Sequence, residues 1–142
     1  MASAARPTGL IATSGLELLS FMTGNGQKAS ILLEELKESY GGKPEYAVQS
    51  ISIFQNIQKE PWFTALSPNG KIPVLVDHDA KNENGDGPLA IMEGAAILSY
   101  FCRKFDPEQK FHFKEDPHLS VQEQWISWQV GGIGAAQGQA NQ

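Results

Sequence analysis

The chain of 142 residues lacks several features that would define its class at once. It has a single cysteine, so no internal disulfide can form, which fits a reducing compartment. No apolar run reaches the length of a membrane span, and the first residues, MASAARPTG, do not resemble a secretory signal. The net charge is −5 without a basic run, which argues against nucleic acid and anionic membranes as partners. We therefore expect a globular, cytoplasmic protein.

Motifs for metals, phosphates and cysteine catalysis are also missing. The histidines His78, His112 and His118 have no metal-ligand spacing with one another or with Cys102, so no metal site is expected. Cys102 lies in an apolar helical segment without a C-x-x-C partner, which favours a packed thiol over a reactive one. The glycine-rich patterns of phosphate loops and dinucleotide-binding folds are not present either.

The spacing of apolar residues predicts an α/β unit. Alternating or continuous apolar runs predict strands, and apolar residues three or four apart predict helices. The expected elements are strands at 16–21, 46–53, 71–79 and 88–92 and helices at 26–40, 61–66 and 93–106. A helix between the first two strands makes them parallel, while a short turn makes the last two antiparallel. We therefore expect a four-stranded mixed sheet covered by helices.

The remainder of the chain predicts a short helical part. Residues 107–119 have the composition of a linker, and Ser120 with Glu123 forms a capping box that would open a helix. The glycines of GGIGAAQGQANQ make continuation of that helix marginal. Trp125 and Trp128 are expected to be core or interface residues rather than substrate contacts. The predicted division is a domain at 1–106 and a helical part at 107–142.

Three local patterns predict a ligand site. The stretch FMTGNGQKAS places a glycine-rich turn with Asn25 at the start of a helix, where anions are favoured. Ile72-Pro73 at a strand start is best explained by a cis bond that exposes the Ile72 backbone to an extended ligand. Glu93 and Gly94 place a carboxylate beside free amides, which suits a ligand head with an ammonium and a carboxylate. Together they suit a short peptide.

The same stretches resemble a known family. TGNGQKASILLEEL, NIQKEPWFTALSPNGKIPVLVD, MEGAAILSYF and QWISWQVGGIG, in this order and spacing, resemble glutathione S-transferases of the fungal and bacterial group that includes the yeast nitrogen-regulator prion protein. The resemblance implies a thioredoxin-like domain followed by an all-helical domain, glutathione as co-substrate or recycled catalyst, and a homodimer. Typical members continue for several more helices, so it also implies that the helical part is truncated.

The resemblance assigns site roles by position. Thr23 and Asn25 correspond to the catalytic polar pair beside the glutathione sulfur. The expected glutathione-binding residues, from the glycyl end to the γ-glutamyl head, are Gln58, Lys71, Ile72, Pro73, Glu93 and Gly94. Two positions depart from the family pattern. Gly94 stands where serine is usual, which removes a hydroxyl donor, and Gly24 replaces a residue that is commonly proline.

The chemistry implied is stabilisation of a thiolate. A thiolate held this way can attack a small electrophilic substrate and leave as a conjugate, which is the transferase reaction that we expect. It can instead add to an activated olefin, permit rotation and depart, which is a cis–trans isomerisation of an unsaturated natural product in secondary metabolism. A third alternative is a catalytically weak glutathione-binding regulatory protein. The glutathione half is the same for all three.

Overall fold

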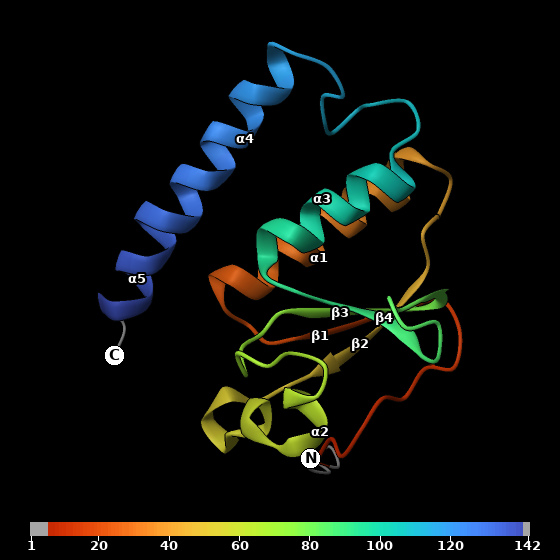
Figure 1. Ribbon diagram of the computed structural model, residues 1–142, viewed down its shortest axis with the longest axis vertical. Coiled ribbons are helices and arrows are strands. Elements are labelled where there is room, and N and C mark those ends of the chain that lie inside the picture. Colours follow the sequence, from red (N-terminus) through yellow and green to blue (C-terminus); the bar gives the residue numbers. More distant parts are fainter. Residues whose placement is uncertain (1–5, 141–142) are drawn as a thin grey trace.

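A four-stranded mixed sheet forms the centre of the protein (Figure 1). The computed structural model describes residues 6–140, and the strands lie in the order β2-β1-β3-β4. Their bounds are β1 Leu16–Ser20, β2 Tyr46–Ser50, β3 Val74–Lys81 and β4 Pro88–Met92. β1 runs parallel to β2 and antiparallel to β3, and β3 is antiparallel to β4. This is the thioredoxin-like arrangement that the sequence predicted.

Helices cover both faces of the sheet. The long helices α1 (Gly24–Ser39) and α3 (Gly94–Phe105) lie together on one face, and α2 (Pro61–Thr64) lies on the other with the short turns η1 (Ile53–Gln55) and η2 (Ile57–Lys59) (Figure 1). Neighbouring strand residues therefore enter different cores: Leu18 packs with α1 and α3, whereas Leu19 packs with Phe63 of α2. Burial on both faces explains why β1 is a continuous buried run.

A buried carboxylate fixes the segment that follows α3. Asp106 accepts hydrogen bonds from the Tyr40 hydroxyl, the Lys110 amide (2.9 Å), the Phe111 amide (2.8 Å) and His112 Nδ1 (2.7 Å). Burial alone would raise the pKa of this carboxyl, but these donors lower it to about 2. Because Tyr40 is the residue at which α1 ends, Asp106 ties the linker to the sheet-bearing part of the molecule.

The helical part is longer than the sequence predicted. α4 (His118–Trp128), the π-helical η3 (Gln129–Gly134) and α5 (Ala135–Ala140) follow one another as a rod beside the sheet-bearing body (Figure 1). The glycines do not end the helix. A Cβ at Gly134 would stand only 3.2 Å from the Gln129 carbonyl oxygen, so glycine permits the wider turn. Within residues 6–140, no helix is long and apolar enough to cross a membrane.

The predicted capping box is wrong. α4 begins at His118, two residues before Ser120, and Pro117 stands at its N-cap position without a side-chain cap. The Ser120 hydroxyl instead donates to Asp116 Oδ1 at 2.5 Å. Proline has a backbone angle that is already close to helical, so the helix can start before the serine. The linker is correspondingly shorter than 107–119.

Asp106→Asn should destabilise the fold in a pH-dependent way. The folded pKa of about 2 lies below the unfolded value, so ionisation of Asp106 contributes about 2 to 3 kcal/mol at neutral pH, and this is lost as pH falls from about 4 towards 2. In urea unfolding, the variant should lose about 3 kcal/mol near neutral pH, and the gap to wild type should narrow in acid. Asp86→Asn, in the exposed β3–β4 turn, is the control. A constant gap across pH would contradict this account.

Candidate functional site

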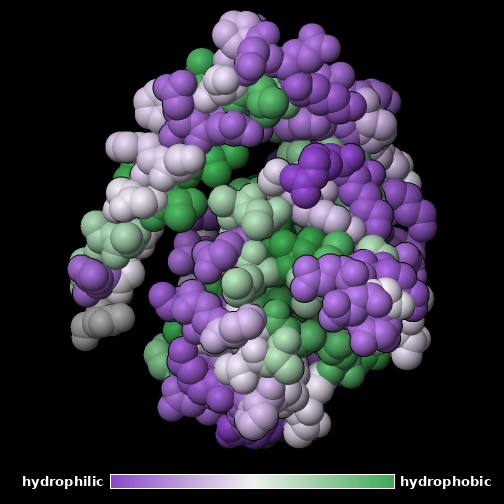
Figure 2. All heavy atoms as spheres, viewed as in Figure 1, coloured by the Kyte–Doolittle hydropathy of each residue, from purple (hydrophilic) through white to green (hydrophobic). Residues whose placement is uncertain are grey.

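A pocket of about 510 Å³ opens between the sheet-bearing body and the helical rod. Figure 2 shows the surface hollowed between these two parts, with apolar side chains on both sides. The start of α1, the segment before β3 and the start of α3 form one side of the pocket. Polar lining comes mostly from this side: Asn25, Lys28, Ser67, Asn69, Lys71 and Glu93. Leu98 of α3 and the rod supply the apolar wall, including Trp125, Ile126, Val130 and Ala135.

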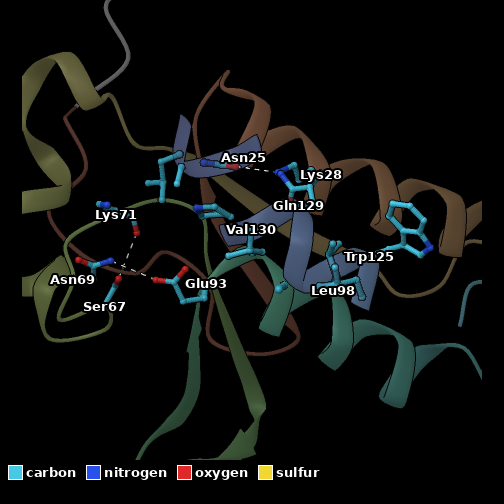
Figure 3. Close-up of a pocket in the computed structure, with 17 residues that line it drawn as sticks. Asn25, Lys28, Ser67, Asn69, Lys71, Glu93, Leu98, Trp125, Gln129 and Val130 are labelled. Carbon is cyan, nitrogen blue, oxygen red and sulfur yellow. Dashed lines mark hydrogen bonds between the residues drawn. The ribbon is translucent and has the colours of Figure 1, made fainter. Parts of the chain in front are cut away.

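The turn after β1 delivers Asn25 to this pocket. α1 begins at Gly24, not at Gly26 as predicted, because Thr23 is its N-cap and Thr23 Oγ1 accepts a hydrogen bond from the Gly26 amide at 3.2 Å. Asn25 therefore lies in the first helical turn, where backbone amides have no intrahelical acceptor. Its side-chain oxygen accepts a hydrogen bond from Lys28 Nζ at 3.1 Å (Figure 3).

Thr23 is the N-cap of α1 and is not among the residues that line the pocket. Its hydroxyl oxygen accepts from the Gly26 amide, which leaves the hydroxyl hydrogen able to donate, so its predicted place beside the ligand sulfur stays a prediction. A threonine directly before a helix, with its side-chain oxygen bonded to the backbone N–H three residues later, is a common helix N-cap. Of the two predicted catalytic residues, the structure brings only Asn25 to the pocket.

The segment before β3 contributes two of the predicted residues to the pocket. The Ile72–Pro73 bond is cis, and both residues line the pocket. β3 begins only at Val74, so Pro73 precedes the strand instead of lying within it. Proline has no N–H for the sheet ladder, which explains the later start. Because the pairing of β3 with β1 also begins at Val74, Ile72 lies outside that ladder.

Glu93 and Gly94 stand at the start of α3. Glu93 is the N-cap residue, with a φ of 72° that is unusual for a residue with a side chain. Its Oε1 accepts a hydrogen bond from Asn69 Nδ2 at 3.3 Å, which holds the carboxylate towards the segment before β3 (Figure 3). A Cβ at Gly94 would meet nothing within 4 Å, so the side chain missing there leaves open space. Backbone strain of this kind is commonly kept at binding sites.

Of Lys71 and Gln58, both predicted at one end of the ligand, only Lys71 is among the residues that line the pocket. Gln58 is buried outside it, and its Nε2 donates to the Ile53 carbonyl at 3.4 Å. η2 packs beneath the turn that ends at Gly70, where a Cβ would approach the Gln58 carbonyl oxygen to 2.9 Å. The role of Gln58 at the ligand therefore stays a prediction, and the structure shows only that its side chain is buried outside this pocket.

Trp125 was assigned to a core or an interface, and the structure places it at the pocket. Trp125 and Trp128 are 64% and 56% exposed and meet edge to face at 5.6 Å between ring centroids. Trp125, Ile126, Gln129 and Val130 line the pocket together. Their spacing of one, four and five residues marks one face of a helix, and this signal could have identified them.

Three residues with potential metal-ligand atoms lie close together, although their spacing in the sequence did not predict it. Potential ligand atoms of Cys102, Asp106 and His112 lie within 4.8 Å of one another. Both oxygens of Asp106 are already used by the four donors described above, and burial, then the Asp106 charge, raise the pKa of the Cys102 thiol to about 11. We interpret the cluster as a structural junction between α3 and the linker.

The fold places the protein in the thioredoxin-like class, and sequence comparison identifies the family. The family model "Glutathione S-transferase, N-terminal domain" matches residues 25–104, which is more than half of the chain. The chain is 34% identical over 124 residues to the Escherichia coli (strain K12) protein named "Disulfide-bond oxidoreductase YfcG", covering 87% of this chain and 53% of that protein. It is 36% identical over 96 residues to Glutathione S-transferase 1 of Schizosaccharomyces pombe, covering 67% and 39%.

Solved structures are similar in the same way. A glutathione transferase family member from Pseudomonas fluorescens pf-5, solved with two glutathione bound, has a TM-score of 0.73 at 34% identity, covering 87% of this chain and 49% of that one. A homolog from Lodderomyces elongisporus, with two GSH per subunit, has a TM-score of 0.78 at 35% identity, covering 90% and 56%. The chain belongs to the glutathione S-transferase family. It spans about half the length of these relatives.

Gly26→Ala should disrupt the turn that carries Asn25. A Cβ at Gly26 would stand closer than 3.0 Å to the Phe21 carbonyl oxygen and Ser20 Oγ, both at the end of β1. We expect a loss of about 3 kcal/mol in the free energy of unfolding, measured in urea. Gly24→Ala is the matched control, because its Cβ would meet nothing within 4 Å. Equal stability of the two variants would show that the close approach does not constrain the turn.

Proposed function

We propose that this protein binds glutathione in the pocket and uses the glutathione thiolate to attack a small electrophilic substrate. One observation carries the proposal: Asn25, the Ile72 backbone and Glu93, from three separate parts of the chain, line one pocket. The glutathione bound in the similar structures from Pseudomonas fluorescens and Lodderomyces elongisporus supports this choice of ligand. The relatives are about twice as long as this chain, so the proposal rests on the half of the family fold that this chain matches.

Each end of glutathione has a chemical partner in the pocket. The Glu93 carboxylate suits the γ-glutamyl ammonium, and the Gly94 amide at the start of α3 suits the neighbouring carboxylate. The Ile72 backbone can pair with the cysteinyl unit as an added strand would. Lys71 offers a cation to the glycyl carboxylate. With these contacts made, the cysteinyl sulfur would face Asn25.

Activation requires preferential binding of the thiolate. Lowering a thiol pKa from about 8.5 to about 6.5 corresponds to about 2.7 kcal/mol. A neutral hydrogen bond contributes about 1 kcal/mol, and one to a charged group about 1.5 to 3 kcal/mol. The Asn25 amide hydrogens and the positive end of α1 together come within this range. Water can take the proton, so no basic side chain is required.

The second substrate meets the opposite wall. Trp125, Ile126 and Val130 present apolar surface across from the polar side of the pocket. In the conjugation that we propose, the thiolate sulfur forms a bond to an electrophilic carbon, and the leaving group departs with its electron pair. The apolar wall would hold the carbon skeleton of that substrate and exclude water from the reaction.

Disulfide exchange is a second candidate, favoured by the names of two relatives. The chain is 34% and 38% identical to the E. coli proteins named disulfide-bond oxidoreductases YfcG and YghU. Cys102, the single cysteine of the chain, does not line the pocket, so glutathione itself would supply the thiol. Its thiolate would attack one sulfur of a disulfide and release the other as a thiol. This forms a mixed disulfide between glutathione and the substrate. A second glutathione thiolate would then attack the glutathione sulfur of the mixed disulfide, which gives glutathione disulfide and releases the remaining substrate sulfur as a second thiol.

Other expectations from the sequence stay proposals. A glutathione-dependent isomerase and a glutathione-binding regulator use the same half-site. A homodimer, a cytoplasmic location and the division into domains at 1–106 and 107–142 likewise stay predictions, as does the expectation that no metal is used.

Asn25→Ala should reduce turnover much more than glutathione binding. We expect a loss of about tenfold to a hundredfold in kcat for conjugation of a chromogenic aryl halide, because a donor to the developing anion is removed. Glutathione affinity, measured by calorimetry, should change little. Gln27→Ala is the control, since this amide lies in the same helical turn, is exposed and does not line the pocket.

The same assays separate the candidate functions. Reduction of a small dialkyl disulfide without aryl halide conjugation would favour the oxidoreductase, and altered olefin geometry with unconsumed glutathione would favour the isomerase. Glutathione binding without any turnover would favour the regulator. If Asn25→Ala kept full turnover, the assignment of the activating residue would be wrong.

A further inference from the structure

The structure adds a group that can act on the sulfur. The resemblance placed the Thr23 hydroxyl beside Asn25, and in the structure the oxygen of that hydroxyl caps α1. Lys28, which the sequence analysis did not assign, lines the pocket, one helical turn after Asn25. The inference that follows rests on the proposed function, because it concerns the glutathione thiolate.

When the charged residues of the pocket are matched to the charged groups of glutathione, the sulfur is the group that remains for Lys28. Glutathione in its thiolate form carries one ammonium, two carboxylates and one thiolate. The charged residues that line the pocket are Lys28, Lys71 and Glu93. Glu93 suits the ammonium, the start of α3 suits the adjacent carboxylate, and Lys71 suits the glycyl carboxylate. The remaining negative group is the thiolate, and the remaining cation is Lys28.

The contact between Lys28 and Asn25 orients the amide. Lys28 Nζ donates to Asn25 Oδ1 at 3.1 Å, as the dashed line in Figure 3 shows. An asparagine amide has an acceptor oxygen at one end and a donor nitrogen at the other. With the ammonium on the oxygen, the NH₂ group is the end left for a ligand. Rotation by half a turn would present the oxygen to the thiolate, which is repulsive.

The positive charge of Lys28 is not neutralised by a carboxylate in the described part of the chain. Lys37, on the same helix, shows the alternative, because its Nζ lies 3.4 Å from Glu34 Oε1 in an ordinary surface ion pair. Lys28 takes part in none of the ion pairs found among residues 6–140, and its hydrogen-bond partner is a neutral amide. A full charge therefore stands beside the group expected to meet the sulfur.

We propose that Lys28 is a positioning residue for thiolate formation. Lys28 holds the Asn25 oxygen so that the amide hydrogens face the glutathione sulfur, and its positive charge balances the thiolate. Its role is exerted through Asn25 and through the local potential, not by contact with a carboxylate of glutathione. Lys28 thereby adds to the stabilisation that the Asn25 amide and the start of α1 provide.

The test is the pKa of the bound glutathione thiol, followed by ultraviolet absorbance of the thiolate against pH. Lys28→Met should raise this pKa by about one unit, a tenfold loss of thiolate at a pH below both values. Glutathione affinity measured with the thiol protonated should change by less than about threefold. Lys28→Arg should retain the charge effect in part, and Lys37→Met should behave as wild type.

A double-mutant cycle tests the path through Asn25. If Lys28 acts mainly by orienting the amide, Lys28→Met should have a smaller effect in the Asn25→Ala background than in wild type. An unchanged thiol pKa in Lys28→Met would overturn the inference, and so would loss of glutathione binding, which would make Lys28 a carboxylate contact. Failure of the wild-type protein to bind glutathione would instead overturn the proposed function.

Discussion

The close approach of Gly26 to the end of β1 is the constraint on which the site depends. A side chain at Gly26 would collide with the Phe21 carbonyl oxygen and with Ser20, so α1 can begin there only because glycine has no Cβ. The Thr23 cap then fixes the first turn of the helix. These two contacts place Asn25 and Lys28 among the residues that line the pocket, where the proposal has them act together on the glutathione sulfur.

The other parts of the site are held to this point by the sheet and by the linker. β3 joins the Ile72 segment to β1, and α3, which carries Glu93 at its start, packs with α1 on the same sheet face. Asp106 then attaches the linker to the end of α1, which is why the helical rod faces the pocket. The glutathione chemistry that we propose requires this joint placement, because no single segment could offer the head-group, backbone and sulfur contacts together.

Much of the fold could be predicted because burial determines it. The alternation that sends Leu18 and Leu19 into different cores predicts a covered sheet, and the start of α3 coincides with the predicted pair at 93–94. The sequence could not show how polar side chains divide between capping and binding. Thr23 has the residue type for either role, and the structure uses it as a cap. Gln58 is polar yet buried, because the packing of η2 decides its direction.

Two residues of the pocket, Lys28 and Trp125, were not assigned to it from the sequence. Lys28 resembles any solvent-exposed helix lysine until Asn25 is seen to accept its hydrogen bond. From the sequence alone, Trp125 is an apolar helix residue of the kind that packs in a core or an interface. Its place at the pocket follows only from the position of α4. Both depend on contacts that form only after the helices have been placed, so local sequence pattern carries no direct sign of them.

The most direct measurement is a crystal structure of the protein with glutathione bound. The account predicts one tripeptide with its backbone paired to Ile72, its ammonium at Glu93 and its sulfur within hydrogen-bonding reach of the Asn25 amide nitrogen. Glutathione bound elsewhere, or bound here with its sulfur turned away from the start of α1, would contradict it.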